Sequence, residues 1–177
     1  LAATLKGANA LPHITGDRLH DLVRDILLAA GADLRNADRV AEALVSSNLC
    51  GVDTHGVFHL PRYVKEIRNG TVVPTAWPEI VSETPSTALV TGNWTFGHVV
   101  AKYAMEIAIE KASAQTVAVV SFVRATHIGR LGEYPELAAS RGMLSFVWAS
   151  GYSEEAPAAV PFGGRVPALH TNPIAIG

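Results

Sequence analysis

Residues 53–64, DTHGVFHLPRYV, carry two histidines, an aspartate, a threonine and an arginine between two stretches of helical pattern. Gly56 permits backbone conformations that other residues resist, and Pro61 suits the first turn of a helix. We therefore expect this run to be a loop that leads from one helix into the next. A histidine in such a loop can face a cleft and titrate near neutral pH, as a proton donor or acceptor must.

Two other interpretations of this run stay open at this point. Asp53 or Thr54 could cap the following helix, which would leave His55 as a polar surface residue. Alternatively, His55 and His59 could bind a metal together with Cys50 and Asp53. The run lacks the glutamate of an HExxH motif, and a glycine between the histidines weakens a helix that would carry both. Cys50 is more simply placed on the buried apolar face of the preceding helix.

The residues on either side of the run predict three helices. Apolar residues recur at helical spacing over residues 15–30, and Gly31 is a plausible stop. A second helix is expected over about 37–49, and a third over 61–70. Residues 1–72 are therefore predicted to form a small helical lobe.

The remaining residues mix strand and helix patterns. The expected elements, in order, are short strands at 78–83 and 87–92, a helix at 97–114, a buried strand at 116–123, a short helix at 135–141, a strand at 143–150, a loop at 151–165 and an unfinished strand at 174–177. Helices first, then mixed strands and helices, favour an α+β fold. Because the chain starts with Leu and stops in that last strand, we expect a piece of a longer protein.

Composition argues against several classes of protein. The net charge is −2 and no Lys/Arg cluster appears, so a nucleic-acid partner is not expected. No apolar run approaches the ~20 residues of a membrane span. The single cysteine fits a reducing compartment, and a cytoplasmic location is predicted.

A second motif, ATHIGRLGEY at residues 125–134, leads from a predicted strand into a predicted helix. Backbone N–H groups at such a turn can bind an anion. The stretch matches neither a dinucleotide-binding GxGxxG nor a P-loop, so a plain turn is the alternative. VPFGG at 160–164 and HTNP at 170–173 place small or rigid residues beside strands, where a flat ligand could approach the backbone closely.

Taken together and in order, these motifs resemble the malate/L-lactate dehydrogenase family, which is distinct from the Rossmann-fold lactate dehydrogenases. The family includes sulfolactate, ureidoglycolate and 2,3-diketogulonate enzymes and piperideine-carboxylate reductases. The resemblance spans residues 15–177 and implies the N-terminal half of a non-Rossmann α+β fold. It implies a helical lobe at 1–72, followed at 73–177 by a cofactor-binding domain with a mixed, mainly antiparallel sheet that is incomplete at its C-terminus.

The resemblance also implies a function and roles for individual residues. Family members transfer hydride between NAD or NADP and a small 2-oxo or 2-hydroxy acid, usually as homodimers. His55 is the implied acid/base and His127 a second catalytic residue. The residues implied to bind substrate are Thr54, His59 and Arg62, and those implied to lie by the cofactor are Ser150, Gly151, Thr171, Asn172 and Pro173. No metal is implied.

Two positions depart from the family pattern. Many members have arginine, a natural bidentate anchor for a carboxylate, at the position of His59. Many also have Thr-Asn or Ser-Asn where this chain reads Ser150 and Gly151 after a strand. The substrate is therefore left open. The choice between NAD and NADP is also open, because no acidic residue that would read the ribose is identifiable outside a Rossmann unit. The alternative function is that of a truncated, non-catalytic chain of the same fold that acts as a subunit or interaction module.

Overall fold

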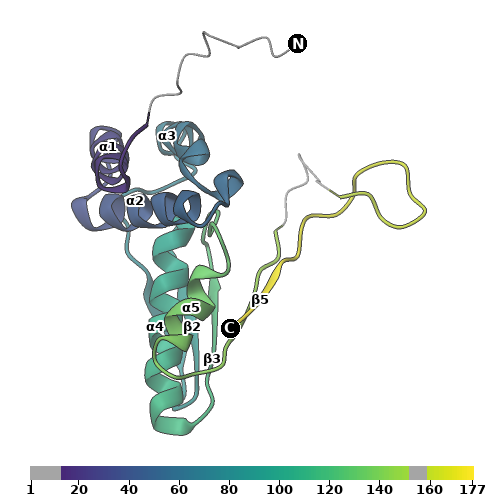
Figure 1. Ribbon diagram of the computed structural model, residues 1–177. Helices are drawn as coiled ribbons and strands as arrows, with labels where there is room; N and C mark the ends of the chain where they lie inside the picture. The colour runs from purple at the N-terminus through teal and green to yellow at the C-terminus, as the bar shows by residue number, and fades with distance from the viewer. Residues whose placement is uncertain (1–12, 152–158) are drawn as a thin grey trace, which may run out of the picture.

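The computed structural model describes residues 13–151 and 159–177 (Figure 1). Its first part is helical, with α1 (Gly16–Ala29), α2 (Leu34–Leu49) and α3 (Leu60–Arg68). Two short 3₁₀ helices, η1 (Asp53–His55) and η2 (Val57–His59), connect α2 to α3. The three predicted helices are confirmed, although α2 begins at Leu34 rather than at residue 37.

Polar side chains begin the first two helices. The hydroxyl of Thr15 accepts a hydrogen bond from the backbone N–H of Arg18, and the carboxylate of Asp33 accepts one from that of Asn36 at 2.8 Å. These bonds satisfy backbone donors that have no partner within the helix. The apolar stripes of the helices then pack into one core, whose buried members include Val23, Leu27, Val40, Leu44 and Tyr63.

Cys50 does not belong to this core. The prediction that it lies on the buried apolar face of α2 is wrong, because Cys50 follows the last residue of the helix and is exposed. Leu49, the last residue of α2, is likewise 76% exposed, so the end of the helix points away from the core.

The second part begins with a three-stranded sheet in the order β1-β2-β3. The strands β1 (Glu79–Glu83) and β2 (Thr87–Thr91) form an antiparallel hairpin, and β3 (Val119–Val123) lies parallel to β2. The long helix α4 (Gly97–Gln115) connects β2 to β3 and packs on the sheet. The buried cluster between helix and sheet contains Ala88, Val90, Val100 and Ile107.

The prediction that the strand in residues 116–123 is buried is wrong for one of its faces. Val119 and Val123 are 53% and 48% exposed. Successive side chains of a strand point to opposite faces, and α4 covers only one face of this sheet. The β-branched run therefore marks a strand that is half covered.

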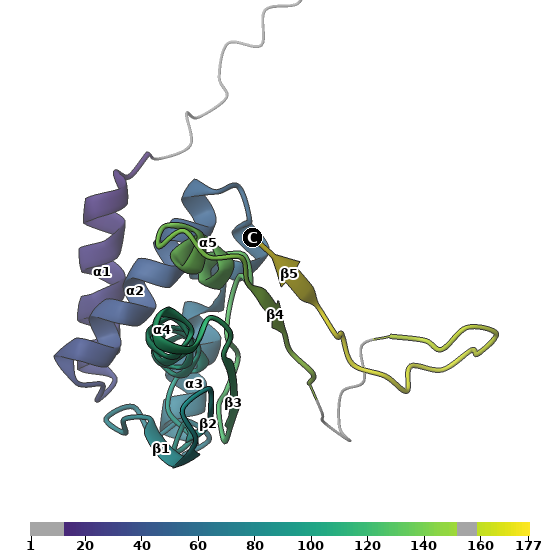
Figure 2. The same ribbon diagram turned by 90° about the horizontal axis from the view of Figure 1, so that it is seen from below.

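The chain ends in a helix and a separate two-stranded ribbon (Figure 2). After α5 (Glu133–Ala139), the strands β4 (Phe146–Trp148) and β5 (Ile174–Ile176) pair antiparallel. Val147 of β4 packs on the buried cluster beside α5, whereas the side chains on the other face of the ribbon are exposed. With two antiparallel pairs and one parallel pair, the predicted α+β class with a mixed sheet is confirmed. Part of the predicted loop at 151–165 lies outside the described residues.

The N-terminus of α4 contributes to both parts of the chain. Phe96 and Val99 belong to the core of the helical part. The buried amide of Asn36 donates hydrogen bonds to the carbonyls of Pro74 and Ala76 at 3.0 and 2.9 Å. The division at residue 72 stays a prediction, and the contacts around it are extensive. Within the described residues, no helix combines the length and hydropathy needed to cross a bilayer.

Candidate active site

Asn48, near the end of α2, organises the loop that carries the first motif. Its amide nitrogen donates to Asp53 at 2.5 Å, and its amide oxygen accepts from the backbone N–H of Val57 at 2.9 Å. A Cβ atom at Gly56 would collide with this amide group. The loop therefore needs glycine at this position, and it turns the chain so that His55 and His59 lie on the same side. Neither Asp53 nor Thr54 caps a helix with its side chain, which removes the capping interpretation.

The structure brings both histidines of the first motif against His127 of the second. The rings of His55 and His127 are stacked with centroids 5.8 Å apart, and the ring of His59 lies 4.7 Å from that of His127. The hydroxyl of Thr54 lies 3.1 Å from Nδ1 of His55 and can orient its ring. We name His55, His59 and His127, with Tyr63 and His98 behind them, the histidine cluster.

Tyr63 and His98 were not among the predicted site residues. The hydroxyl of Tyr63 lies 2.8 Å from Nδ1 of His127. The ring of His98 meets those of Tyr63 and His127 edge-on, with centroids 5.6 and 6.0 Å apart. His98 is fully buried, and neither of its ring nitrogens has a hydrogen-bond partner among the described residues. The one signal in the sequence that could have pointed to His98 is its place among apolar residues at the start of α4.

Two glycines let the backbone come close enough to form the cluster. Gly129 adopts φ +73°, and a Cβ there would lie 2.5 Å from Nε2 of His98. A Cβ at Gly97 would collide with the carbonyls of Thr126 and His127. The N–H of Gly97 instead donates to the hydroxyl of Thr126 at 3.1 Å, which ties the loop with His127 to the start of α4.

Three histidines of the cluster, His59, His98 and His127, favour the uncharged form. Burial, then the positive charges expected on His59, Arg62 and His55, lowers the pKa of His127 to about 4. Burial is also the main reason why the pKa of His98 lies well below its ordinary value, and it lowers the pKa of His59. A carboxylate bound beside His59 would oppose this effect, because a nearby negative charge favours the protonated ring.

The arginines of the two motifs, Arg62 and Arg130, are already paired with carboxylates. Arg62, implied as a substrate ligand, is half exposed and forms an ion pair with Glu66 at 2.7 Å. Arg130 binds Glu136 in a bidentate manner at 2.7 and 2.8 Å. An anionic ligand would have to compete with these carboxylates for the arginines. The histidines and hydroxyls of the motifs can bind such a ligand without that competition.

The five predicted cofactor residues come together at one end of the β4-β5 ribbon. Ser150 and Gly151 follow β4, and Thr171 to Pro173 precede β5. The N–H of Ala149 donates to the carbonyl of Pro173 at 3.2 Å, which joins the two segments. Ala149 also packs on the buried cluster that contains Ile128, the neighbour of His127. The uncharged hydroxyl and amide groups here suit the carboxamide and ribose of a nicotinamide cofactor, and they include no cation for its phosphates.

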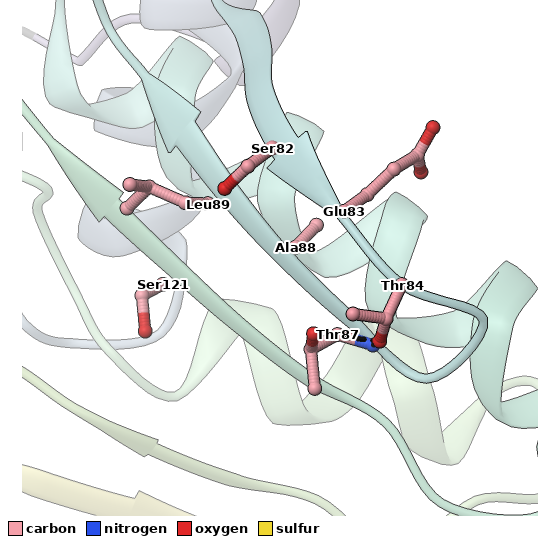
Figure 3. Close-up of a pocket in the computed structure, with 7 residues that line it drawn as sticks. All are labelled: Ser82, Glu83, Thr84, Thr87, Ala88, Leu89 and Ser121. Atoms are coloured by element: carbon pink, nitrogen blue, oxygen red, sulfur yellow. Dashed lines mark hydrogen bonds between the residues drawn. The ribbon is translucent and has the colours of Figure 1, made fainter.

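Two surface hollows lie away from these residues. One, of about 250 Å³, lies over the β1-β2 hairpin and is lined by small and polar side chains, among them Thr84 and Thr87 (Figure 3). The other, of about 460 Å³, lies between α1 and α2. Neither contains a predicted site residue. In the described part of the chain, no three histidine, cysteine or acidic side chains are arranged to hold a metal ion.

Comparison with known proteins shows which proteins this chain is similar to. The L-sulfolactate dehydrogenase of Methanothermobacter thermautotrophicus is 40% identical over 156 residues, which are 88% of this chain and 45% of that protein. The L-lactate dehydrogenase of Cupriavidus necator is 38% identical over 86% of this chain and 44% of its own length. The solved structure of malate dehydrogenase from Pyrococcus horikoshii superimposes with a TM-score of 0.87 at 34% identity, covering 93% of this chain and 46% of that one.

By name, these three relatives are dehydrogenases of sulfolactate, lactate and malate. Residues 14–177 match the family described as malate/L-lactate dehydrogenase. The chain belongs to this family, and it spans about half the length of the relatives it matches.

Proposed function

We propose that the protein is an NAD(P)-dependent oxidoreductase that interconverts a small 2-oxo acid and the corresponding 2-hydroxy acid, as malate or lactate dehydrogenases do. The observation that carries the proposal is the convergence of His55, His59 and His127, from segments about 70 residues apart, in a member of this family. A bound nicotinamide cofactor, held by Ser150, Gly151, Thr171, Asn172 and Pro173, would supply the hydride.

In this proposal, His55 supplies the proton. The oxygen on C2 of the acid becomes negative as the carbonyl is reduced and needs a proton from a correctly placed acid. His55, partly exposed and oriented by Thr54, suits this role. In the reverse reaction the same ring accepts the proton of the 2-hydroxyl group.

The carboxylate of the acid is proposed to lie against His59 and Thr54, with Arg62 joining when it leaves Glu66. A histidine binds a carboxylate best when protonated, and burial lowers the pKa of His59. The acid should therefore bind more tightly at lower pH, and its binding should raise the pKa of His59. The homodimer and the cytoplasmic location expected from the resemblance stay predictions.

The test is oxidation of NADH and NADPH by the intact protein in the presence of a panel of 2-oxo and cyclic imino acids. His55→Ala should lower turnover by roughly 100-fold or more, the usual size of a general acid's contribution. His20→Ala is the matched control, because His20 lies on α1, beside Asp21 and Asp38 and outside the cluster. A near-normal rate for His55→Ala would remove His55 from the mechanism. A wild-type protein without turnover on the whole panel would favour the non-catalytic alternative.

A further inference from the structure

Tyr63 is buried beside the proposed site and touches one of its histidines directly. Its side chain is 1% exposed, and its hydroxyl lies 2.8 Å from Nδ1 of His127. The rings of Phe96 and His98 meet it edge-on, with centroids 6.3 and 5.6 Å away. The burial of the ring and these contacts hold the hydroxyl in place beside His127.

The direction of this hydrogen bond follows from the surroundings of the hydroxyl. Nδ1 of a neutral histidine can donate or accept, depending on which nitrogen carries the proton. His127 is the hydroxyl's one hydrogen-bond partner among the described residues. If Nδ1 donated, the phenolic proton would be buried without an acceptor, which costs free energy. Burial raises the pKa of Tyr63, so the phenol keeps its proton. Tyr63 therefore donates, and Nδ1 accepts.

We infer that Tyr63 is a positioning residue that holds His127 as a neutral ring with its proton on Nε2, so that this N–H is the donor offered to the C2 oxygen of the acid. The inference rests on the proposed function and separates the roles of the two histidines. His127 stabilises the charge that develops on the oxygen, as a fixed hydrogen-bond donor can. His55 supplies the proton. One group thus stays neutral throughout while the other changes its charge.

The groups around His127 favour the same state. Those that face it are His55 from η1, His59 from η2, Arg62 and Tyr63 from α3, and His98 from α4. All of them are neutral or cationic, so a positive charge on His127 gains nothing from them. The hydrogen bond from the N–H of Gly97 to the hydroxyl of Thr126 holds the backbone next to His127. The state of His127 then depends on which of its ring nitrogens carries the proton.

The test is ¹⁵N NMR of the intact protein labelled at histidine, recorded across a pH titration. The wild-type spectrum should show Nδ1 of His127 unprotonated and Nε2 protonated at neutral pH. Tyr63→Phe keeps the ring and removes the hydroxyl. It should release the tautomer into a mixture and raise the titration midpoint of His127 by about 0.5 to 1 pH unit, the equivalent of one net hydrogen bond to the neutral form.

Tyr103→Phe is the matched control. Tyr103 lies on α4, its ring packs on that of Trp77, and it is not in the cluster. It should leave the spectrum and the titration midpoint of His127 unchanged. A wild-type His127 protonated on Nδ1, or a Tyr63→Phe variant with an unchanged spectrum and titration, would overturn the inference. A protein that shows the expected spectrum but turns over no 2-oxo acid would refute the proposed function while supporting the hydrogen bond assigned to Tyr63.

Discussion

Replacing Gly129 by alanine tests the close packing on which the histidine cluster depends. Gly129 has φ +73°, and the added Cβ would lie 2.5 Å from Nε2 of His98. The left-handed conformation costs an L-residue about 1–2 kcal/mol, and overpacking a well-packed interior costs typically about 1–3 kcal/mol more. His98 cannot swing away cheaply, because it is fully buried between Tyr63 and His127. Gly129→Ala should therefore reduce the free energy of unfolding by about 2–5 kcal/mol.

Gly142→Ala separates the two contributions. Gly142 has nearly the same backbone angle, φ +72°, but no atom lies within 4 Å of its added Cβ. Its loss should be the backbone cost alone, about 1–2 kcal/mol. The assay is urea-induced unfolding of the intact protein, followed by tryptophan fluorescence. Combining Gly129→Ala with His98→Ala should cost less than the sum of the two single changes, because the smaller side chain makes room. Equal losses for the two glycine variants, or an additive double variant, would refute the packing argument.

Two further predictions concern charge. The pKa of His127 is lowered from 6.5 to about 4, so between these pH values the unfolded state binds more protons than the folded state. The free energy of unfolding is therefore highest above about pH 6.5 and falls as the pH is lowered toward 4. Unfolding measured at pH 7 and pH 5 should show a smaller decrease for His127→Asn than for the wild type, and equal decreases would contradict the shift. The second concerns Arg39, which is buried and bound to Glu133 at 2.6 Å and to the more exposed Glu42 at 3.0 Å. Glu133→Gln should cost about 3 kcal/mol of unfolding free energy, and its control Glu42→Gln about 1 kcal/mol or less; comparable losses would show that the buried pair has no special weight.

The spacing of apolar residues predicted the three helices. The start of α2 was predicted three residues late, because the capping bond from the N–H of Asn36 to the carboxylate of Asp33 was not recognised in the sequence. Pro61 indicated the start of α3, because proline suits the first turn of a helix, where its missing N–H costs nothing. Strand exposure was predicted less well, because the alternation of Val119 and Val123 depends on which face α4 covers.

Part of the candidate site also followed from the sequence. His55, His59 and His127 were implied by resemblance of their motifs to a family, and the structure brings them together. Tyr63 and His98 were missed, because each sits in a helix whose pattern is explained by apolar packing alone. The role of Arg62 as a substrate ligand stays a prediction, and its ion pair with Glu66, one helical turn later, was not foreseen.

The sequence by itself determined the local elements, the order of the motifs and the family, since each depends on residues close together in the chain. Only the tertiary structure decided how the proposed site is built. The contact between Tyr63 and His127 joins residues 64 positions apart, and its direction depends on burial that no single segment specifies. The physical reason is that protonation and hydrogen bonding respond to the local dielectric and to neighbouring groups, and these exist only once α3, α4 and the loop of the second motif have packed together.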